Sequence, residues 1–167
     1  KTSDPKYELE FNSTVNSLHQ IKNSNLIVAG CESGRLFIID PITGTFNDHL
    51  KMQGNGPCLD ITSNKFGHIA AVFKTANQSY ASVFESKTGR PISKEFNNGT
   101  DISVVKFSHD GTKIICLPSG KDTNNEISTG NENVASVWPV SISLNNIVDP
   151  NLPKMMTTLG GLKLNSK

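Results

Sequence analysis

The polar stretch from residue 118 to residue 133 holds the side chains whose types and spacing come closest to a chemical site. Four oxygen-bearing residues alternate there as the ligands of a calcium-binding loop do: Asp122, Asn124, Glu126 and Ser128. Ile127 stands where such a loop requires glycine, and Asn133 stands where a bidentate glutamate would complete the coordination. We therefore predict no calcium site.

Other patterns that could support chemistry are incomplete. The 4 histidines show no metal-ligand spacing, and no Ser-His-Asp order or carboxylate pair stands out from the polar turns. The glycine-rich run Gln53–Pro57 is followed by no Lys-Ser/Thr pair, which a phosphate-binding loop needs. The sequence predicts no catalytic residue, no cofactor and no metal.

The charge of the chain is almost balanced, with 16 Lys and Arg against 15 Asp and Glu and a net charge of +1. Such a balance gives no electrostatic footprint for DNA, RNA or an anionic membrane, so direct nucleic-acid binding is not expected. No apolar run is long enough to cross a bilayer, and the first residues do not resemble a signal peptide. We expect a soluble intracellular protein, nuclear or cytoplasmic.

The cysteines bear on the redox environment. They are odd in number, lack CxxC spacing and fall in or beside apolar strands: Cys31, Cys58 and Cys116. This pattern favours buried reduced thiols over a disulfide framework. Glycosylation sequons at Asn12, Asn77 and Asn98 would suit a secreted protein instead, although asparagine is abundant enough here to produce chance sequons.

The elements that must position any site are strands in a repeating pattern. The run Arg35–Ile39 is apolar and rich in β-branched residues, Asp40 ends it, and Gly44 supplies turn chemistry. The pattern returns 45 residues later, where Glu85 corresponds to Asp40 and Gly89 corresponds to Gly44. The chain therefore contains an internal repeat.

A third copy contains Trp138, which lies 54 residues after its counterpart Phe84 because the long polar loop precedes it. A tight Asp-Gly turn precedes the second strand of this unit. The residues that mark the repeated pattern are Gly34, Asp40, Gly44, Glu85, Gly89, Asp110, Gly111 and Trp138.

A strand and turn that recur at roughly 40 to 45 residues have the period of a four-stranded propeller blade. We predict an all-β fold of antiparallel blades, with units at about residues 12–52, 57–96 and 101–144. Outer strands are expected at Tyr7–Phe11 and Phe46–Met52. Residues 1–6 are expected to form a tail, and residues 145–167 a linker or C-terminal extension.

The phrases GRLFIID, SYASVFE, SHDGTKI and ASVWP resemble WD40 repeats, over about residues 7–144. Asp40 matches the aspartate of the Trp-Asp pair that ends the third strand in this family, with Ile39 in place of the tryptophan. Trp138 matches the tryptophan, with Pro139 in place of the aspartate. The family's Gly-His dipeptide is absent, so the blades are expected to be held mostly by apolar packing, and a related non-WD propeller remains an alternative.

The resemblance also implies where partners dock. Three units are fewer than the roughly four to eight blades of a closed ring, so we expect the rest of the ring in the parent chain, or partner strands that complete it. In the family, the connection between second and third strands faces the narrower channel opening, where partners often dock. The polar loop supplies the candidate binding residues: Lys121, Asp122, Asn124, Asn125 and Glu126. Its composition is equally typical of an insertion without a binding role.

The function that the resemblance implies is a non-catalytic protein–protein interaction scaffold in a eukaryotic multi-protein complex. An alternative is a subunit of a ribonucleoprotein assembly or processing particle, in ribosome biogenesis or splicing, without strong direct RNA binding. A third is an enzyme built on a propeller, with acids such as Asp60 or Asp101 near the channel.

Overall fold

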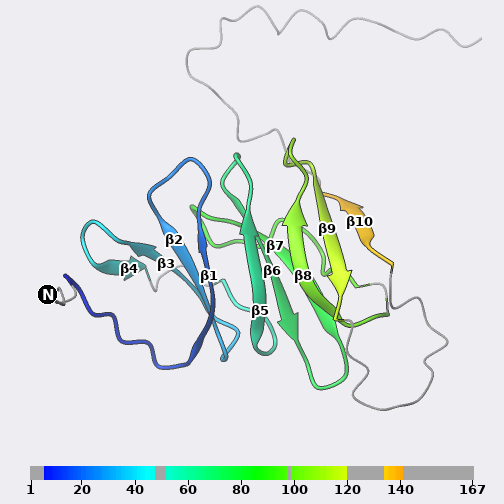
Figure 1. The fold of residues 1–167 in the computed structure, drawn as a ribbon, viewed down its shortest axis with the longest axis horizontal. Helices are drawn as coiled ribbons and strands as arrows, with labels where there is room; N and C mark the ends of the chain where they lie inside the picture. The colour runs from blue at the N-terminus through cyan, green and yellow to red at the C-terminus, as the bar shows by residue number, and fades with distance from the viewer. Residues whose placement is uncertain (1–5, 48–51, 98, 120–133, 141–167) are drawn as a thin grey trace, which may run out of the picture.

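The chain forms three antiparallel β-sheets in a computed structural model that describes residues 6–47, 52–97, 99–119 and 134–140 (Figure 1). No helix occurs within these ranges. The prediction of an all-β fold is therefore confirmed. In the part of the chain that the structure describes, no helix is long and apolar enough to span a membrane.

Sheet 1 contains four strands paired in chain order: β1 (Val15–Gln20), β2 (Ile27–Cys31), β3 (Leu36–Asp40) and β4 (Thr45–Asn47). Strand β3 is buried from its first residue to Ile39, as expected for an apolar run with both faces covered. β4 is shorter than the predicted outer strand. Met52, which was expected in this outer strand, instead contacts the start of β3. Its carbonyl oxygen accepts a hydrogen bond of 2.9 Å from the Leu36 N–H.

Sheet 2 contains β5 (Cys58–Ser63), β6 (His68–Lys74) and β7 (Ser79–Glu85), and sheet 3 contains β8 (Ile102–Phe107), β9 (Lys113–Pro118) and β10 (Ser136–Pro139). Isolated bridges join Pro91 and Phe96 to β7, so residues 91–96 follow the outer edge of sheet 2 without forming a regular strand. The prediction of four strands in every unit is therefore met in sheet 1 only, as far as the described residues extend.

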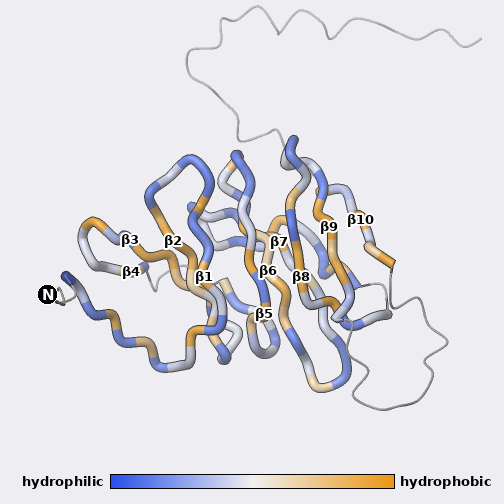
Figure 2. The backbone as a smooth tube through the Cα atoms, viewed as in Figure 1, coloured by the Kyte–Doolittle hydropathy of each residue, from blue (hydrophilic) through white to orange (hydrophobic). Residues whose placement is uncertain are grey.

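The sheets lie face to face along the chain, and their first strands β1, β5 and β8 are neighbours (Figure 1). One apolar cluster joins sheets 1 and 2, and it includes Val28, Leu36, Ile38, Ile61, Ile69, Ala71, Phe73, Tyr80 and Phe84. A second cluster joins sheets 2 and 3, and it includes Ala70, Val72, Ala81, Val83, Ile102, Val105, Ile114, Cys116 and Val140. Hydrophobic residues follow the strands, and hydrophilic residues gather at many of the turns (Figure 2).

Sheet 2 is the centre of this arrangement because both its faces are covered. Along β6, Ala71 and Phe73 belong to the cluster with sheet 1, whereas Ala70 and Val72 belong to the cluster with sheet 3. This alternation is the period of a β-strand. Phe73 is fully buried, and burying a side chain of that size contributes about 1.5–3 kcal/mol.

The segment Tyr7–Phe11 forms no strand, contrary to the prediction. Its alternating pattern instead places the Phe11 ring against two rings of sheet 1, with centroid distances of 5.3 Å to Phe37 and 5.2 Å to Phe46. The alternating pattern thus reflects a segment that is buried on one side, and its backbone is not paired with a neighbouring strand. This segment covers the face of sheet 1 that points away from sheet 2.

Candidate functional site

The two turns that follow β3 and β7 have the same geometry. The Gly44 N–H donates to the Asp40 carbonyl oxygen at 2.9 Å, and the Gly89 N–H donates to the Glu85 carbonyl oxygen at 2.8 Å. The two glycines have φ values of 67° and 70°, a region that side chains other than glycine rarely adopt. The spacing of 45 residues seen in the sequence therefore corresponds to a repeated structural unit.

The acidic side chains of these turns support them locally. Asp40 Oδ1 accepts hydrogen bonds from the backbone N–H groups of Ile42 (2.8 Å) and Thr43 (3.4 Å), and the bond from Ile42 is the main cause of its lowered pKa. Glu85 Oε2 accepts a bond of 2.6 Å from the Thr88 hydroxyl. Both carboxylates stabilise turns, and neither reaches the neighbouring sheet through these bonds.

Two further marker residues lie in the turn between β8 and β9. Asp110 accepts bonds from the Ser108 hydroxyl (2.6 Å), the Thr112 N–H (3.0 Å) and the Thr112 hydroxyl (2.8 Å), which hold its pKa well below its usual value. Gly111 follows it with a φ of 77°. Gly34 lies between β2 and β3, and its carbonyl oxygen accepts a bond of 3.0 Å from the Gly54 N–H.

Trp138 lies in β10 and is partly buried. Its ring packs against Phe96 at a centroid distance of 5.8 Å and borders the apolar cluster between sheets 2 and 3. The candidate binding residues of the polar loop, Lys121, Asp122, Asn124, Asn125 and Glu126, lie outside the described residues. The segment proposed as a linker, residues 145–167, lies outside them as well.

Asp60 of β5 connects sheet 2 to sheet 3. Its Oδ2 atom accepts hydrogen bonds from the Val105 N–H at 3.0 Å and from Lys106 Nζ at 3.1 Å. A carboxylate on β5, the first strand of sheet 2, thus accepts a hydrogen bond from a backbone N–H on β8, the first strand of sheet 3. Buried backbone donors need such partners, so this contact fixes the relative position of the two sheets.

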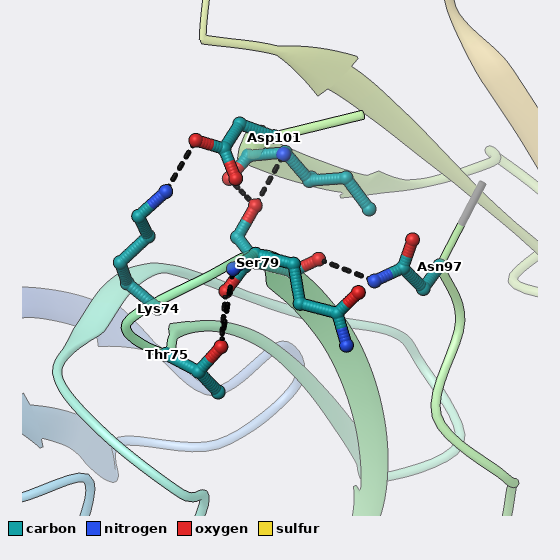
Figure 3. A network of polar contacts seen from close by, with 7 residues as sticks. Lys74, Thr75, Ser79, Asn97 and Asp101 are labelled. Carbon is teal, nitrogen blue, oxygen red and sulfur yellow. Dashed lines mark hydrogen bonds and ion pairs between the residues drawn. The ribbon is translucent and has the colours of Figure 1, made fainter. Parts of the chain in front are cut away.

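A second link between the same sheets surrounds Ser79 at the start of β7 (Figure 3). Its hydroxyl donates to the Ile102 carbonyl oxygen at 2.7 Å and also accepts from the Ile102 N–H. Beside it, Lys74 forms an ion pair with Asp101, and Asn97 donates a bond of 3.0 Å to the Ser79 carbonyl oxygen. Asp101, like Asp60, is therefore engaged in joining two sheets.

His19 of β1 connects sheet 1 to sheet 2. Its Nε2 atom accepts a bond of 3.1 Å from the Ser63 N–H, so the ring is neutral with its proton on Nδ1. The Ser63 hydroxyl in turn accepts a bond of 2.9 Å from the Lys22 N–H. Burial lowers the pKa of His19, with the charges of Lys106 and Lys22 acting in the same direction and Asp60 opposing them.

Asn64 forms a further polar link between sheets 2 and 3, and it is only 2% exposed. Its Oδ1 atom accepts bonds of 3.0 Å from the N–H groups of Phe66 and His68, which fixes the orientation of the amide. Its Nδ2 atom then donates to the Gly111 carbonyl oxygen at 3.0 Å and to His68 Nδ1 at 3.1 Å. The turn of sheet 2 is thereby bonded to the turn of sheet 3.

The three cysteines are free and buried, as predicted. Burial raises the pKa values of the Cys58 and Cys116 thiols to about 12 and also raises that of Cys31. The thiols are thus poor nucleophiles at neutral pH. No group of three His, Cys, Asp or Glu side chains suited to a metal ion occurs in the described ranges.

Sequence reasoning missed the polar links of His19, Asn64 and Ser79. Asn64 did leave a signal, because Asn64 and Gly67 have the same spacing as Ser108 and Gly111 in the corresponding turn of sheet 3. The hydrogen bond from Asn64 to Gly111 in sheet 3, however, depends on how the two sheets pack, so the sequence did not predict it.

Comparison of the sequence with protein-family models gives no match, and comparison with curated proteins gives none either.

Proposed function

We propose that the chain forms part of a WD40-like β-propeller that acts as a non-catalytic scaffold for protein–protein interactions. The observation that carries this proposal is the succession of three antiparallel sheets, stacked face to face in chain order with β1, β5 and β8 adjacent. Successive blades of a propeller have this relationship. The repeated turns after β3 and β7 support the same interpretation.

The contacts between the sheets suit a rigid support for exposed loops. Two apolar clusters join each sheet to the next. The polar links of Asp60, Ser79 and Asn64 also join sheets 2 and 3. Binding residues are often carried on loops that a rigid scaffold positions. We assign partner binding to the polar loop between β9 and β10, with residues 121–126 as the contact segment. We also propose an intracellular location, in the nucleus or the cytoplasm.

Affinity purification of the complete protein from its own cells tests this function. We expect a fixed set of protein partners that survives nuclease treatment, identified by mass spectrometry. Loss of these partners after nuclease would favour the alternative, a subunit of a ribonucleoprotein assembly particle. A protein that purifies alone under both conditions would contradict the scaffold function. Turnover that a single Asp60 or Asp101 substitution abolishes would support the enzyme alternative.

A further inference from the structure

The turns that join the first and second strands of the three sheets lie together at one end of the molecule (Figure 1). The Lys22 N–H donates to the Ser63 hydroxyl at 2.9 Å, which joins the turn of sheet 1 to sheet 2. The side chain of Asn64 joins the turn of sheet 2 to that of sheet 3. The turn after β7 is attached as well, because the Ser86 N–H donates to the Gly67 carbonyl oxygen at 2.9 Å. We call this continuous surface the turn face, and it consists of residues 21–26, 64–67, 86–90 and 108–112.

Cationic side chains predominate on the turn face. Its exposed cations are Lys22, Lys65, Lys87 and Arg90, and none of them forms a salt bridge with another described residue. The acid within the same segments is Asp110, which accepts hydrogen bonds from Ser108 and Thr112 of its own turn. The flanking strand residues Glu85 and Lys113 carry opposite charges. The turn face therefore has an excess of positive charge.

The opposite end of the sheets does not have this excess. The turns between β2 and β3 and between β6 and β7 carry one cation and one acid, Arg35 and Glu32. Beside them, Lys74 is paired with Asp101. Because the net charge of the chain is only +1, the positive charge of the turn face is a local feature.

Phe66 is an exposed aromatic residue in this mostly polar surface, with 43% of its surface open to solvent. In the turn of sheet 3, the position before the glycine holds Asp110, which closes its turn with hydrogen bonds that a phenyl ring cannot make. The Phe66 ring is nevertheless held by its neighbours. Lys65 Nζ lies 5.3 Å from the ring centroid, and a Cβ atom at Gly111 would lie 3.1 Å from Phe66 Cε2. An exposed ring that is already positioned is suited to anchor a partner.

The composition of the turn face favours a polypeptide partner over a nucleic acid. Single-stranded nucleic acids stack successive bases on several aromatic side chains, whereas the segments of the turn face contain the single phenyl ring of Phe66. Asp110 and Glu85 lie among the cations and would repel a continuous phosphate backbone, but a peptide can place its carboxylates beside individual lysines. A second copy of this chain would present the same cations, which disfavours a symmetric dimer through this face.

We propose that the turn face binds an acidic segment of a partner protein, whose carboxylates pair with Lys22, Lys65 and Lys87 and whose apolar side chain packs on Phe66. Exposed ion pairs contribute little affinity, so the contact with the phenyl ring is the main anchor and the cations select an acidic sequence. The connection between β9 and β10 begins at the opposite end of the sheets, so this surface is separate from the polar loop. The inference uses contacts among described residues and does not require a closed ring.

Fluorescence anisotropy with defined peptides tests the inference on the complete protein. The probe is a fluorescein-labelled peptide of Asp and Glu residues with one central tryptophan, and a second peptide has alanine in place of the tryptophan. We expect the tryptophan peptide to bind more tightly than the alanine peptide, and both to lose affinity as the salt concentration rises. Absence of binding by the tryptophan peptide at low salt would overturn the proposal.

Variants locate the binding surface. Lys65→Glu is expected to weaken binding of the tryptophan peptide roughly fivefold or more, because attraction becomes repulsion. Lys94→Glu makes the same charge change at an exposed residue outside the turn face and should leave binding nearly unchanged. Phe66→Ala should weaken binding roughly tenfold and abolish the difference between the two peptides. Melting temperatures verify that the variants fold, and equal binding by Lys65→Glu and Lys94→Glu would overturn the proposal.

A labelled oligouridylate, measured in parallel, distinguishes a nucleic-acid surface from a peptide surface. We expect the RNA to bind more weakly than the tryptophan peptide. RNA binding that is tighter than peptide binding, and is lost in both Lys65→Glu and Phe66→Ala, would assign the turn face to single-stranded nucleic acid and overturn the proposal. The purification experiment remains an independent test of the scaffold function, because it does not depend on these peptides.

Discussion

The Asn64 side-chain amide donates a hydrogen bond to the Gly111 carbonyl oxygen at 3.0 Å, across 47 residues of chain. Asn64 is only 2% exposed, and its Oδ1 atom also accepts the N–H groups of Phe66 and His68. One buried side chain therefore closes its own turn and holds the equivalent turn of the next sheet. This dual role makes it the most informative single position for the contact between sheets 2 and 3.

Replacing Asn64 by alanine is expected to lower the free energy of unfolding by at least about 2 kcal/mol, because buried groups left without partners cost about 1–3 kcal/mol each. Asn64→Asp should also destabilise, since a carboxylate cannot donate to Gly111. Urea denaturation measures both changes. Asn16→Ala is the control, because the Asn16 amide donates to the Glu32 side chain at an exposed site. Equal effects of the Asn64 and Asn16 substitutions would contradict the assigned role.

Gly30 of β2 packs closely against Cys58 and Ile61 of sheet 2. A Cβ atom there would lie 2.4 Å from Cys58 Sγ and 2.7 Å from Ile61 Cδ1. Gly30→Ala is therefore expected to destabilise the chain by about 1–3 kcal/mol through overpacking. Cys58→Ala in the same chain should recover part of this loss, because it removes the sulfur. Additive effects in the double-mutant cycle, measured by urea denaturation, would show that the two positions do not share this contact.

The stability of the chain is expected to fall in mildly acidic solution. His19 Nε2 and His68 Nδ1 both accept hydrogen bonds, and burial lowers the pKa of each ring below 6.5. The unfolded chain consequently takes up protons first as the pH falls. The contribution of both rings is complete above 6.5 and is lost as the pH falls through their lower folded pKa values.

Urea denaturation at several values between about pH 8 and pH 5 measures this loss, in the range where histidine titrates. A variant with His19→Gln and His68→Gln keeps an oxygen acceptor at each position but cannot titrate there. Its stability should depend less on pH than that of the wild type. The same pH dependence in both proteins would contradict the role given to the two rings.

The polar loop can be tested separately from the fold. Replacing Asp122–Gly130 by a Gly/Ser segment of equal length should weaken binding to the purified partners while leaving the melting temperature nearly unchanged. Partner binding is measured by quantitative co-purification. As a control, Lys87→Ala changes an exposed residue in the turn after β7. Full binding by the loop variant would remove residues 121–126 from the interface.

The sequence predicted those features that depend on local chemistry. The apolar strands β3 and β7 and the turns at Gly44 and Gly89 could be located because each is specified by adjacent residues. The segment Tyr7–Phe11 was assigned wrongly as a strand, since an alternating pattern reports one-sided burial and does not identify the groups that pair with the backbone.

The links between sheets could not be predicted in the same way. His19 and Ser63 are 44 residues apart, and their contact exists only because β1 and β5 lie side by side. The link of Asp60 to Val105 likewise depends on the approach of β8 to β5. Such pairs follow from the packing of whole sheets, which no short stretch of sequence determines.

An experimental structure of the complete protein with its co-purified partners is the most direct test of the central claim. The account predicts that β1, β5 and β8 lie around a common axis and that further antiparallel sheets complete the ring. Three sheets whose first strands do not surround a common axis would contradict it.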